Sequence, residues 1–161
     1  MIKVRRACPF DARQMAELLN EIIAIGGTTA LTIPVEAAEI KKWMQANRSA
    51  WFVAEDDMGI VLGFQWIEDY DTLPDNHGAI STFVRAGQTG LGIGTKLFDE
   101  MKTAARSLGY VAIEAIIRAD NEGGLAYYQS RGFENIRFLP SVTLDNGTKV
   151  DKIWKRYDLT I

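Results

Sequence analysis

The sequence predicts an α/β (α+β) fold, with one mixed sheet of about seven strands flanked by about four helices. The chain of 161 residues with 47% hydrophobic content can bury one sizeable core, so we expect a single domain over residues 1–161. Segments with the periodicities of strands and helices follow in the order strand, two helices, three strands, helix, strand, helix, two strands. No repeat or low-complexity linker interrupts this order, which also favours one domain.

Composition excludes several classes of protein. The formal charge of -3 provides no basic field for a nucleic-acid backbone, so neither DNA nor RNA is an expected partner. The single cysteine, Cys8, excludes an internal disulfide and a multi-cysteine zinc site, and we expect no metal. No apolar stretch reaches the roughly 18 residues of a membrane span, and Met1 to Phe10 lacks a secretory signal segment. We therefore expect a cytoplasmic protein that does not bind membranes.

The N-terminal half predicts a strand, two helices and a hairpin. Asp11 and Gln14 have the spacing of a capping box, and the apolar residues after them recur on one helical face until Gly26 and Gly27 end the helix. A second helix is expected from about Pro34, with Ile40, Trp43 and Met44 on one side. The strands expected here are Lys3–Arg6, Trp51–Ala54 and Ile60–Ile67, the last two joined by a turn at residues 56–59.

The C-terminal half alternates strands and helices. A polar loop from Glu68 to His77 leads to the strand Ala79–Val84 and, after a glycine run, to a helix from Ile93 to Leu108. The nearly continuous apolar run Val111–Ile117 predicts a strand covered on both faces, in the middle of the sheet. The remaining expected elements are a helix over Glu122–Arg131 and the strands Phe133–Leu139 and Val150–Tyr157, which flank an Asp145-Asn146-Gly147 turn.

Three glycines at alternate positions, Gly90, Gly92 and Gly94, stand at the start of the third helix. A dinucleotide fingerprint would need glycine at Thr95, and a Walker loop would need glycine at Thr89 and the order Lys-Ser/Thr after Gly94, so both patterns fail. Backbone N–H groups from Thr89 to Thr95 could still surround an anion, helped by the unpaired donors and the positive dipole end of the helix. The run therefore predicts a cradle for a diphosphate.

A second segment of the same character begins at Asp120, where a strand passes into a helix. Gly123 and Gly124 lie in the first helical turn, although glycine costs up to roughly 1 kcal/mol against alanine inside a helix. Asn121 and Tyr128 are nearly two turns apart and therefore share one face. This helix is expected to be shaped for the close approach of a ligand.

Together the two segments resemble the GCN5-related N-acetyltransferase (GNAT) family. The family signature Gln/Arg-x-x-Gly-x-Gly/Ala matches Thr89 to Gly94 at both glycines, with Thr89 in place of Gln or Arg. The second signature, Asn-x-x-Ala with a later Tyr and Gly-Phe, matches Asn121, Gly124, Tyr128 and Gly132-Phe133, with glycine in place of alanine. The order of the expected elements agrees with the family over essentially the whole chain.

The resemblance implies an acetyl-CoA-dependent N-acetyltransferase with its sheet splayed between the fourth and fifth strands. The pantetheine arm would run between Ala79–Val84 and Val111–Ile117, with backbone contacts at Phe83 and Val84 and a side-chain contact at Asn121. Tyr128 would be the general acid that protonates the departing thiolate. The diphosphate would bind at Thr89, Gly90, Leu91, Gly92, Ile93, Gly94 and Thr95.

The resemblance is strongest to the phosphinothricin or amino-acid acetyltransferase branch, which implies the primary amine of a small molecule as acceptor. Gly26 to Thr32 resembles the substrate-side loop of that branch, and a homodimer could form as in that branch. A protein lysine or N-terminal amine is the second enzymatic interpretation. A CoA-binding module without turnover is the alternative from another class.

One departure from the family concerns the general base. Many members carry a glutamate on the fourth strand, and alignment without gaps places Ala79 at that position. His77 would share a strand face with Ala79 if the strand extends that far, and Glu114 stands in an otherwise apolar strand. The general base could be His77, Glu114 or water alone. Each side chain also has a structural interpretation, as a loop histidine or as a strand residue facing a solvated groove.

Overall fold

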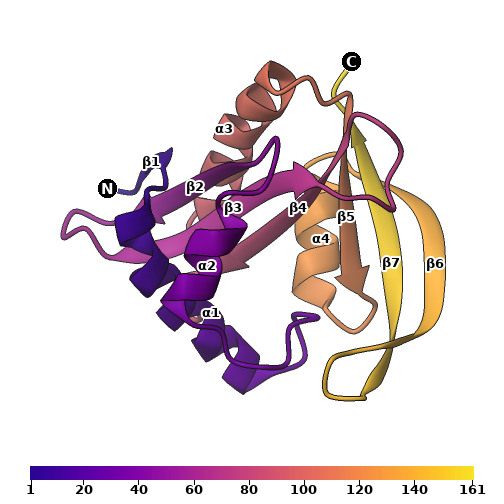
Figure 1. Ribbon diagram of the computed structural model, residues 1–161, viewed down its shortest axis with the longest axis horizontal. Helices are drawn as coiled ribbons and strands as arrows, with labels where there is room; N and C mark the ends of the chain where they lie inside the picture. The colour runs from indigo at the N-terminus through magenta and orange to yellow at the C-terminus, as the bar shows by residue number, and fades with distance from the viewer.

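The computed structural model describes residues 1–161 and has seven strands in one sheet with four α-helices (Figure 1). The order of elements predicted from the sequence is confirmed. The elements are β1 (Lys3–Arg6), the 3-10 turn η1 (Pro9–Asp11), α1 (Ala12–Ile25), α2 (Ala37–Trp43), β2 (Ala50–Glu55), β3 (Val61–Asp69), β4 (His77–Val84), α3 (Ile93–Ser107), β5 (Ala112–Arg118), α4 (Glu122–Ser130), β6 (Glu134–Thr143) and β7 (Lys149–Asp158).

The strands lie in the order β1-β2-β3-β4-β5-β7-β6, and only the central neighbours β4 and β5 are parallel. These two strands pair over just three residues each, His77–Ala79 with Ala112–Glu114, and separate beyond that point. The predicted splay between the fourth and fifth strands is therefore present, and β5 lies inside the sheet as its apolar sequence indicated. The edge of β4 that faces β5 has no partner strand after Ala79.

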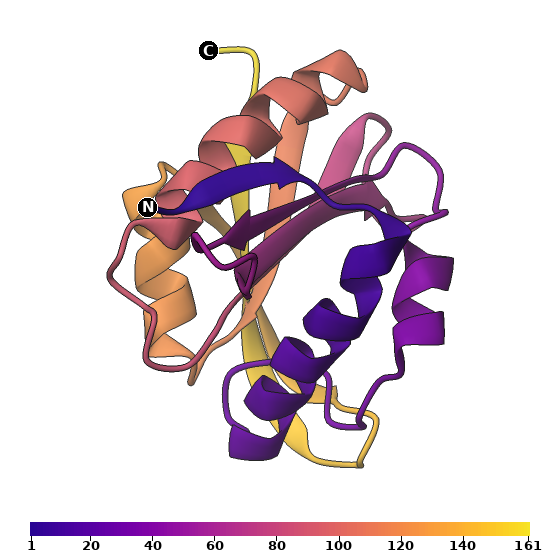
Figure 2. The same ribbon diagram turned by 90° about the vertical axis from the view of Figure 1, so that its left-hand side faces the viewer.

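Helices cover both faces of the sheet, α1 and α2 one face and α3 and α4 the other (Figures 1 and 2). Alternate residues of β2 show the two cores directly, because Trp51 and Val53 pack with α1 and α2 whereas Phe52 and Ala54 pack on the α3 side. None of the helices combines the length and the apolar character needed to cross a membrane.

Three local expectations were wrong. Asp11 and Gln14 form no capping box: Asp11 accepts hydrogen bonds from the Cys8 amide and from Arg5, and Gln14 bonds the backbone of Gly59 and Val61 in the β2–β3 hairpin. Helix α2 begins at Ala37, not near Pro34, because both backbone groups of Val35 bond to the side chain of Asn20 instead of entering a helix.

The third concerns the polar segment after Ile67, which was expected to be a loop from Glu68 to His77. Strand β3 continues to Asp69, and β4 already begins at His77. Glu68 pairs with Ala79, and Asp69 pairs with Gly78. Pairing between neighbouring strands therefore overrides the polar local sequence at both ends of this connection.

Candidate active site

Two cavities meet where β4 and β5 separate. The glycine-loop cavity, of about 760 Å³, lies between the loop before α3, the start of α4 and the end of β4. The charged cavity, of about 470 Å³, lies on the other side of β4 and contains Glu68, Glu114, Arg118 and Lys152. Six residues line both cavities: Thr28, Thr29, Thr82, Phe83, Asn121 and Tyr128. The two cavities therefore adjoin at this shared wall.

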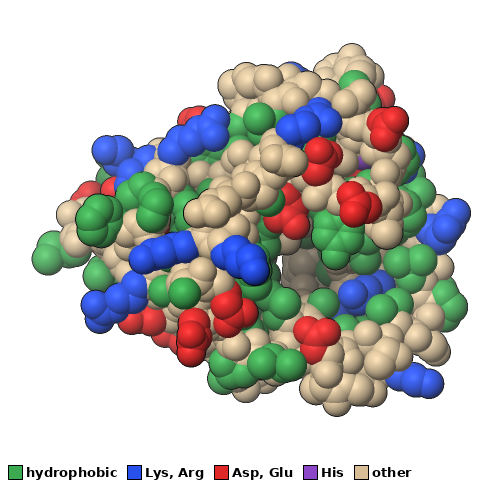
Figure 3. Space-filling view, in the orientation of Figure 1, with side chains coloured by type: hydrophobic (Ala, Val, Ile, Leu, Met, Phe, Trp, Pro, Cys, Tyr) green, Lys and Arg blue, Asp and Glu red, His purple; other side chains and the backbone are tan.

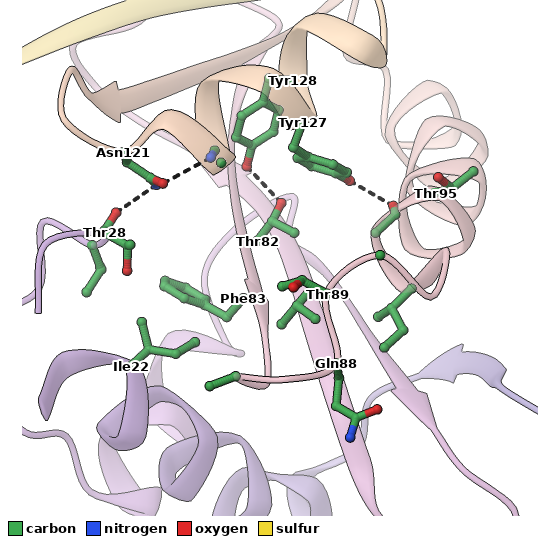
Figure 4. Close-up of a pocket in the computed structure, with 18 of the residues that line it drawn as sticks. Ile22, Thr28, Thr82, Phe83, Gln88, Thr89, Thr95, Asn121, Tyr127 and Tyr128 are labelled. Atoms are coloured by element: carbon green, nitrogen blue, oxygen red, sulfur yellow. Dashed lines mark hydrogen bonds between the residues drawn. The ribbon is translucent and has the colours of Figure 1, made fainter. Parts of the chain in front are cut away.

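Most of the residues that the sequence indicated lie together around the glycine-loop cavity (Figure 4). Leu91 is the exception, since it does not line the cavity and its side chain points to solvent with 55% exposure. The residues brought together are Phe83, Val84, Thr89, Gly90, Gly92, Ile93, Gly94, Thr95, Asn121 and Tyr128.

The three alternate glycines serve two different purposes. Gly90 and Gly92 have φ values of +85° and +76°, and a Cβ on either would meet open space, so the turn needs them for their left-handed backbone. Gly94 lies inside the first turn of α3, where a Cβ would stand 2.6 Å from Cε1 of Tyr127. The third glycine therefore allows Tyr127 to pack closely, and was not required by the backbone turn itself.

The start of α3 offers free donors to the cavity. The helix begins at Ile93, its N-cap residue is Gly92, and no side chain caps it. The first turn of an α-helix has N–H groups without intrahelical partners and carries the positive end of the helix dipole. This end of the cavity is therefore suited to a phosphate-like anion.

Asn121 connects α4 to the loop after α1. Its Oδ1 accepts from the Gly124 amide at 2.9 Å and caps the helix, while its Nδ2 donates to the Thr28 carbonyl at 2.9 Å (Figure 4). A Cβ on Gly124 would lie 2.9 Å from Cγ of Asn121, which explains glycine where alanine was expected. The asparagine thereby closes the cavity wall on this side.

Tyr128 belongs to a buried hydrogen-bond chain. Its hydroxyl lies 2.7 Å from Oγ1 of Thr82, which accepts from Nε2 of the fully buried Gln65 at 2.9 Å. Gln65 also donates to the hydroxyl of Tyr127, which in turn donates to the Gly94 carbonyl at 2.7 Å. Burial raises the pKa of Tyr128 well above the ordinary phenol value and that of Tyr127 to about 12. Both phenols are therefore neutral at physiological pH.

The two side chains considered as general bases contact each other. Nδ1 of His77 lies 2.8 Å from Oε1 of Glu114, and the same oxygen accepts from Nε of Arg156 at 2.6 Å. Oε2 of Glu114 accepts from the indole N–H of Trp154 at 3.1 Å, and the side chain has no exposed surface. Glu114 is thus a buried, paired carboxylate, and His77 is its partner.

Sequence reasoning missed the other charged groups of the charged cavity. Arg118 forms an ion pair with Asp120 and donates to the Thr29 carbonyl, and Lys152 has its pKa lowered by burial and by Arg118. Figure 3 shows the hollowed face, with acidic and basic side chains around the opening. Of these residues, only Arg118 could have been recognised from the sequence, as a charged residue at the end of an apolar strand. Glu68 was assigned to a loop, and Lys152 belongs to no motif.

Comparison with known proteins agrees with this geometry. The model of the acetyltransferase (GNAT) family matches residues 15–133. An L-methionine sulfoximine/L-methionine sulfone acetyltransferase of Pseudomonas paraeruginosa is 29% identical, over 97% of this chain and 94% of that protein. The crystal structure of an N-acetyltransferase from Staphylococcus aureus Mu50 superposes with a TM-score of 0.88 at 25% identity, over 99% of both chains.

A phosphinothricin acetyltransferase from Sinorhizobium meliloti, solved in complex with AcCoA, superposes with a TM-score of 0.87 at 22% identity, over 98% of this chain and 88% of that one. The family model alone covers well over half of the chain. The chain therefore belongs to the acetyltransferase (GNAT) family of acyl-transferring enzymes.

Proposed function

We propose that this enzyme transfers the acetyl group of acetyl-CoA to the primary amine of a small, amino-acid-like zwitterion. The observation that carries the proposal is that the two cavities share the wall formed by Thr82, Phe83, Asn121 and Tyr128. A thioester held in one cavity and an amine held in the other would meet at that shared wall. Proximity of two bound reactants supplies a large part of the rate enhancement in such transfers.

The glycine-loop cavity fits acetyl-CoA. The diphosphate would accept from amides of residues 89–95, with Gly90 and Gly92 setting the turn and the α3 dipole favouring the charge. The pantetheine arm would bond to the free edge of β4 at Phe83 and Val84, since β5 does not pair there. The related S. meliloti enzyme, whose structure contains AcCoA, has the same fold.

The charged cavity fits a zwitterion because it contains charges of both signs. Burial and the nearby Arg118 guanidinium lower the pKa of Lys152, and a substrate carboxylate beside Lys152 would offset that repulsion. Tryptophans 43 and 66 supply apolar walls for a side chain. The P. paraeruginosa relative named above acts on a modified amino acid, L-methionine sulfoximine, which has this combination of charges.

Tyr128 would complete the transfer. The neutral amine attacks the carbonyl carbon, the C–S bond breaks, and the departing thiolate takes the phenolic proton. Burial keeps the phenol protonated, and the same dry surroundings make the thiolate a stronger base. Tyr128 regains a proton from solvent or from the nitrogen as it becomes the amide.

Release of free thiol from acetyl-CoA over a panel of amines tests the proposal. We expect turnover with L-methionine sulfoximine, L-methionine sulfone or phosphinothricin, and little with lysine peptides. Replacing Lys152 by Met should raise KM for an amino acid more than KM for its amide, which lacks the carboxylate. Turnover of peptides alone would indicate a protein acetyltransferase, and tight cofactor binding without thiol release from any amine would indicate a binding module.

We also propose that the enzyme forms a homodimer through β6. This strand is the last of the sheet, and nearly all of its ten residues are exposed, including Ile136 and Phe138 at 44% and 55%. A long exposed edge with apolar side chains is a surface that proteins normally cover. Sedimentation should give a dimer mass that falls to the monomer mass in Phe138→Asp. A monomer at every concentration of the unmodified chain would refute this assembly.

A further inference from the structure

We infer that Glu68 is the general base that takes the proton from the acceptor ammonium, an assignment that rests on the acetyltransferase function proposed above. The pairing of strands β3, β4 and β5 places Glu68 beside the other carboxylate of this cavity. Glu68 on β3 lies opposite Ala79 on β4, and Ala79 lies opposite Glu114 on β5. Side chains opposite one another on paired strands point to the same face of a sheet. Two carboxylates therefore flank the small methyl group of Ala79, and all three residues line the charged cavity.

The two carboxylates differ in how their lone pairs are used. Glu114 accepts hydrogen bonds from Arg156 and Trp154, pairs with His77 and is fully buried, so both of its oxygens already have protein partners. Glu68 accepts one hydrogen bond, from the indole N–H of Trp66 to Oε2 at 3.1 Å. Its other oxygen, Oε1, has no protein partner and remains available to an ammonium or to a bridging water.

Trp66 fixes the free carboxylate in place. Its ring stacks on Trp51 with centroids 4.3 Å apart and contacts Trp43 and Phe83, so the indole N–H that bonds Glu68 has little freedom. Phe83 belongs to the wall shared with the glycine-loop cavity. A base held on this packed tryptophan therefore lies in the cavity that shares a wall with the glycine-loop cavity.

The environment of Glu68 suits a base. Burial raises the pKa of its carboxyl, with the Trp66 hydrogen bond opposing this rise. A carboxylate of raised pKa accepts a proton from an ammonium more readily than an ordinary one does. The other titratable and charged groups that line its cavity are Tyr70, Glu114, Arg118, Tyr128 and Lys152, and Tyr110 lies close enough to be affected by its charge.

The proton balance of the step is complete. The ammonium loses one proton to Glu68, directly or through one water, and its nitrogen lone pair forms the bond to the carbonyl carbon. The nitrogen loses a second proton as the amide forms, and the thiolate gains one from Tyr128. Net, one ammonium and one thioester give one amide, one thiol and one released proton, with no further reactant needed.

Glu68→Gln tests the assignment, because it keeps the shape and the Trp66 contact but removes the basic oxygen. We expect kcat/KM to fall about 100-fold at neutral pH. The loss should shrink as pH rises, because the variant depends on amine already deprotonated in solution, and it should shrink for an acceptor amine of lower pKa. Asp69→Asn, which removes one acidic charge at the next residue on the opposite strand face, should keep the wild-type profile. Affinity for acetyl-CoA by calorimetry should not change in either variant.

A relocation variant checks position instead of charge alone. Since Ala79 lies opposite Glu68, the double variant Glu68→Gln/Ala79→Glu returns a carboxylate to the same face of the sheet. Its kcat/KM should be at least a tenth of the wild-type value, which is roughly ten times the value expected for Glu68→Gln alone. Glu68→Gln within threefold of wild type, with an unchanged pH profile, would overturn the assignment, as would the same loss and profile change appearing instead in His77→Gln. Absence of turnover in the unmodified enzyme with every amine would overturn the proposed function itself, which separates the two failures.

Discussion

Gly94→Ala should destabilise the enzyme although it places alanine, the best helix former, in a helix. The new Cβ would stand 2.6 Å from the Tyr127 ring, which must retreat by about 0.8 Å to reach the ordinary contact distance of 3.4 Å. Overpacking of this kind costs about 1–3 kcal/mol, and weakening the 2.7 Å bond from Tyr127 to the Gly94 carbonyl adds about 0.5–1.5 kcal/mol. The gain in helix propensity, at most about 1 kcal/mol, offsets only part of this, so we expect a net loss of about 2 kcal/mol.

Urea unfolding of a double-mutant cycle separates this clash from other effects. In a Tyr127→Ala background the obstacle is gone, so Gly94→Ala should become neutral or slightly stabilising, with a coupling energy of about 2 kcal/mol. Gly92→Ala is the matched control, since its cost of about 1 kcal/mol comes from φ at +76° with no neighbour near, and should not depend on Tyr127. A Gly94→Ala enzyme as stable as wild type, or a penalty unchanged without Tyr127, would refute the packing role of Gly94.

Three further predictions follow from the site and its supports. Tyr128→Phe keeps the ring packing on Phe133 but removes the acid, so kcat should fall about 100-fold with little change in acetyl-CoA affinity; activity within threefold of wild type would exclude the role. Asn121→Ala loses the α4 cap and the bond to Thr28, costing about 1 kcal/mol in urea unfolding, and hydrogen exchange should quicken in residues 26–32; unchanged exchange there would contradict the connection. The pKa of Asp11 is lowered chiefly by its hydrogen bonds to Arg5. This pair therefore stabilises the fold by about 1.5–3 kcal/mol above pH 3.8, the pKa of Asp11 in the unfolded chain, and the stabilisation is lost as pH falls through the lower pKa of the folded state. Asp11→Asn should weaken the loss of unfolding free energy at acid pH, and an unchanged loss would disprove the pairing.

Local patterns in the sequence determined the elements and their order, because hydrophobic periodicity and turn residues report which backbone conformation a segment adopts. The apolar run at residues 111–117 indicated a strand inside the sheet, and the glycines before Ile93 indicated a helix start whose backbone N–H groups could surround an anion. Asn121 and Tyr128 could be placed on one helical face by spacing alone. Each of these inferences depends on neighbours in the chain.

Only the tertiary structure decided which distant side chains meet. Glu68, Ala79 and Glu114 lie side by side because β3, β4 and β5 pair in this register. The polar residues after Ile67 did not indicate that β3 continues to Asp69. The contact of His77 with Glu114, the approach of Tyr127 to Gly94 and the burial of Gln65 between Thr82 and Tyr127 likewise depend on how separate elements pack. These contacts are stabilised by burial and by hydrogen bonds between polar groups on separate elements. Neither leaves a periodic pattern in the sequence, so neither could be predicted from neighbouring residues.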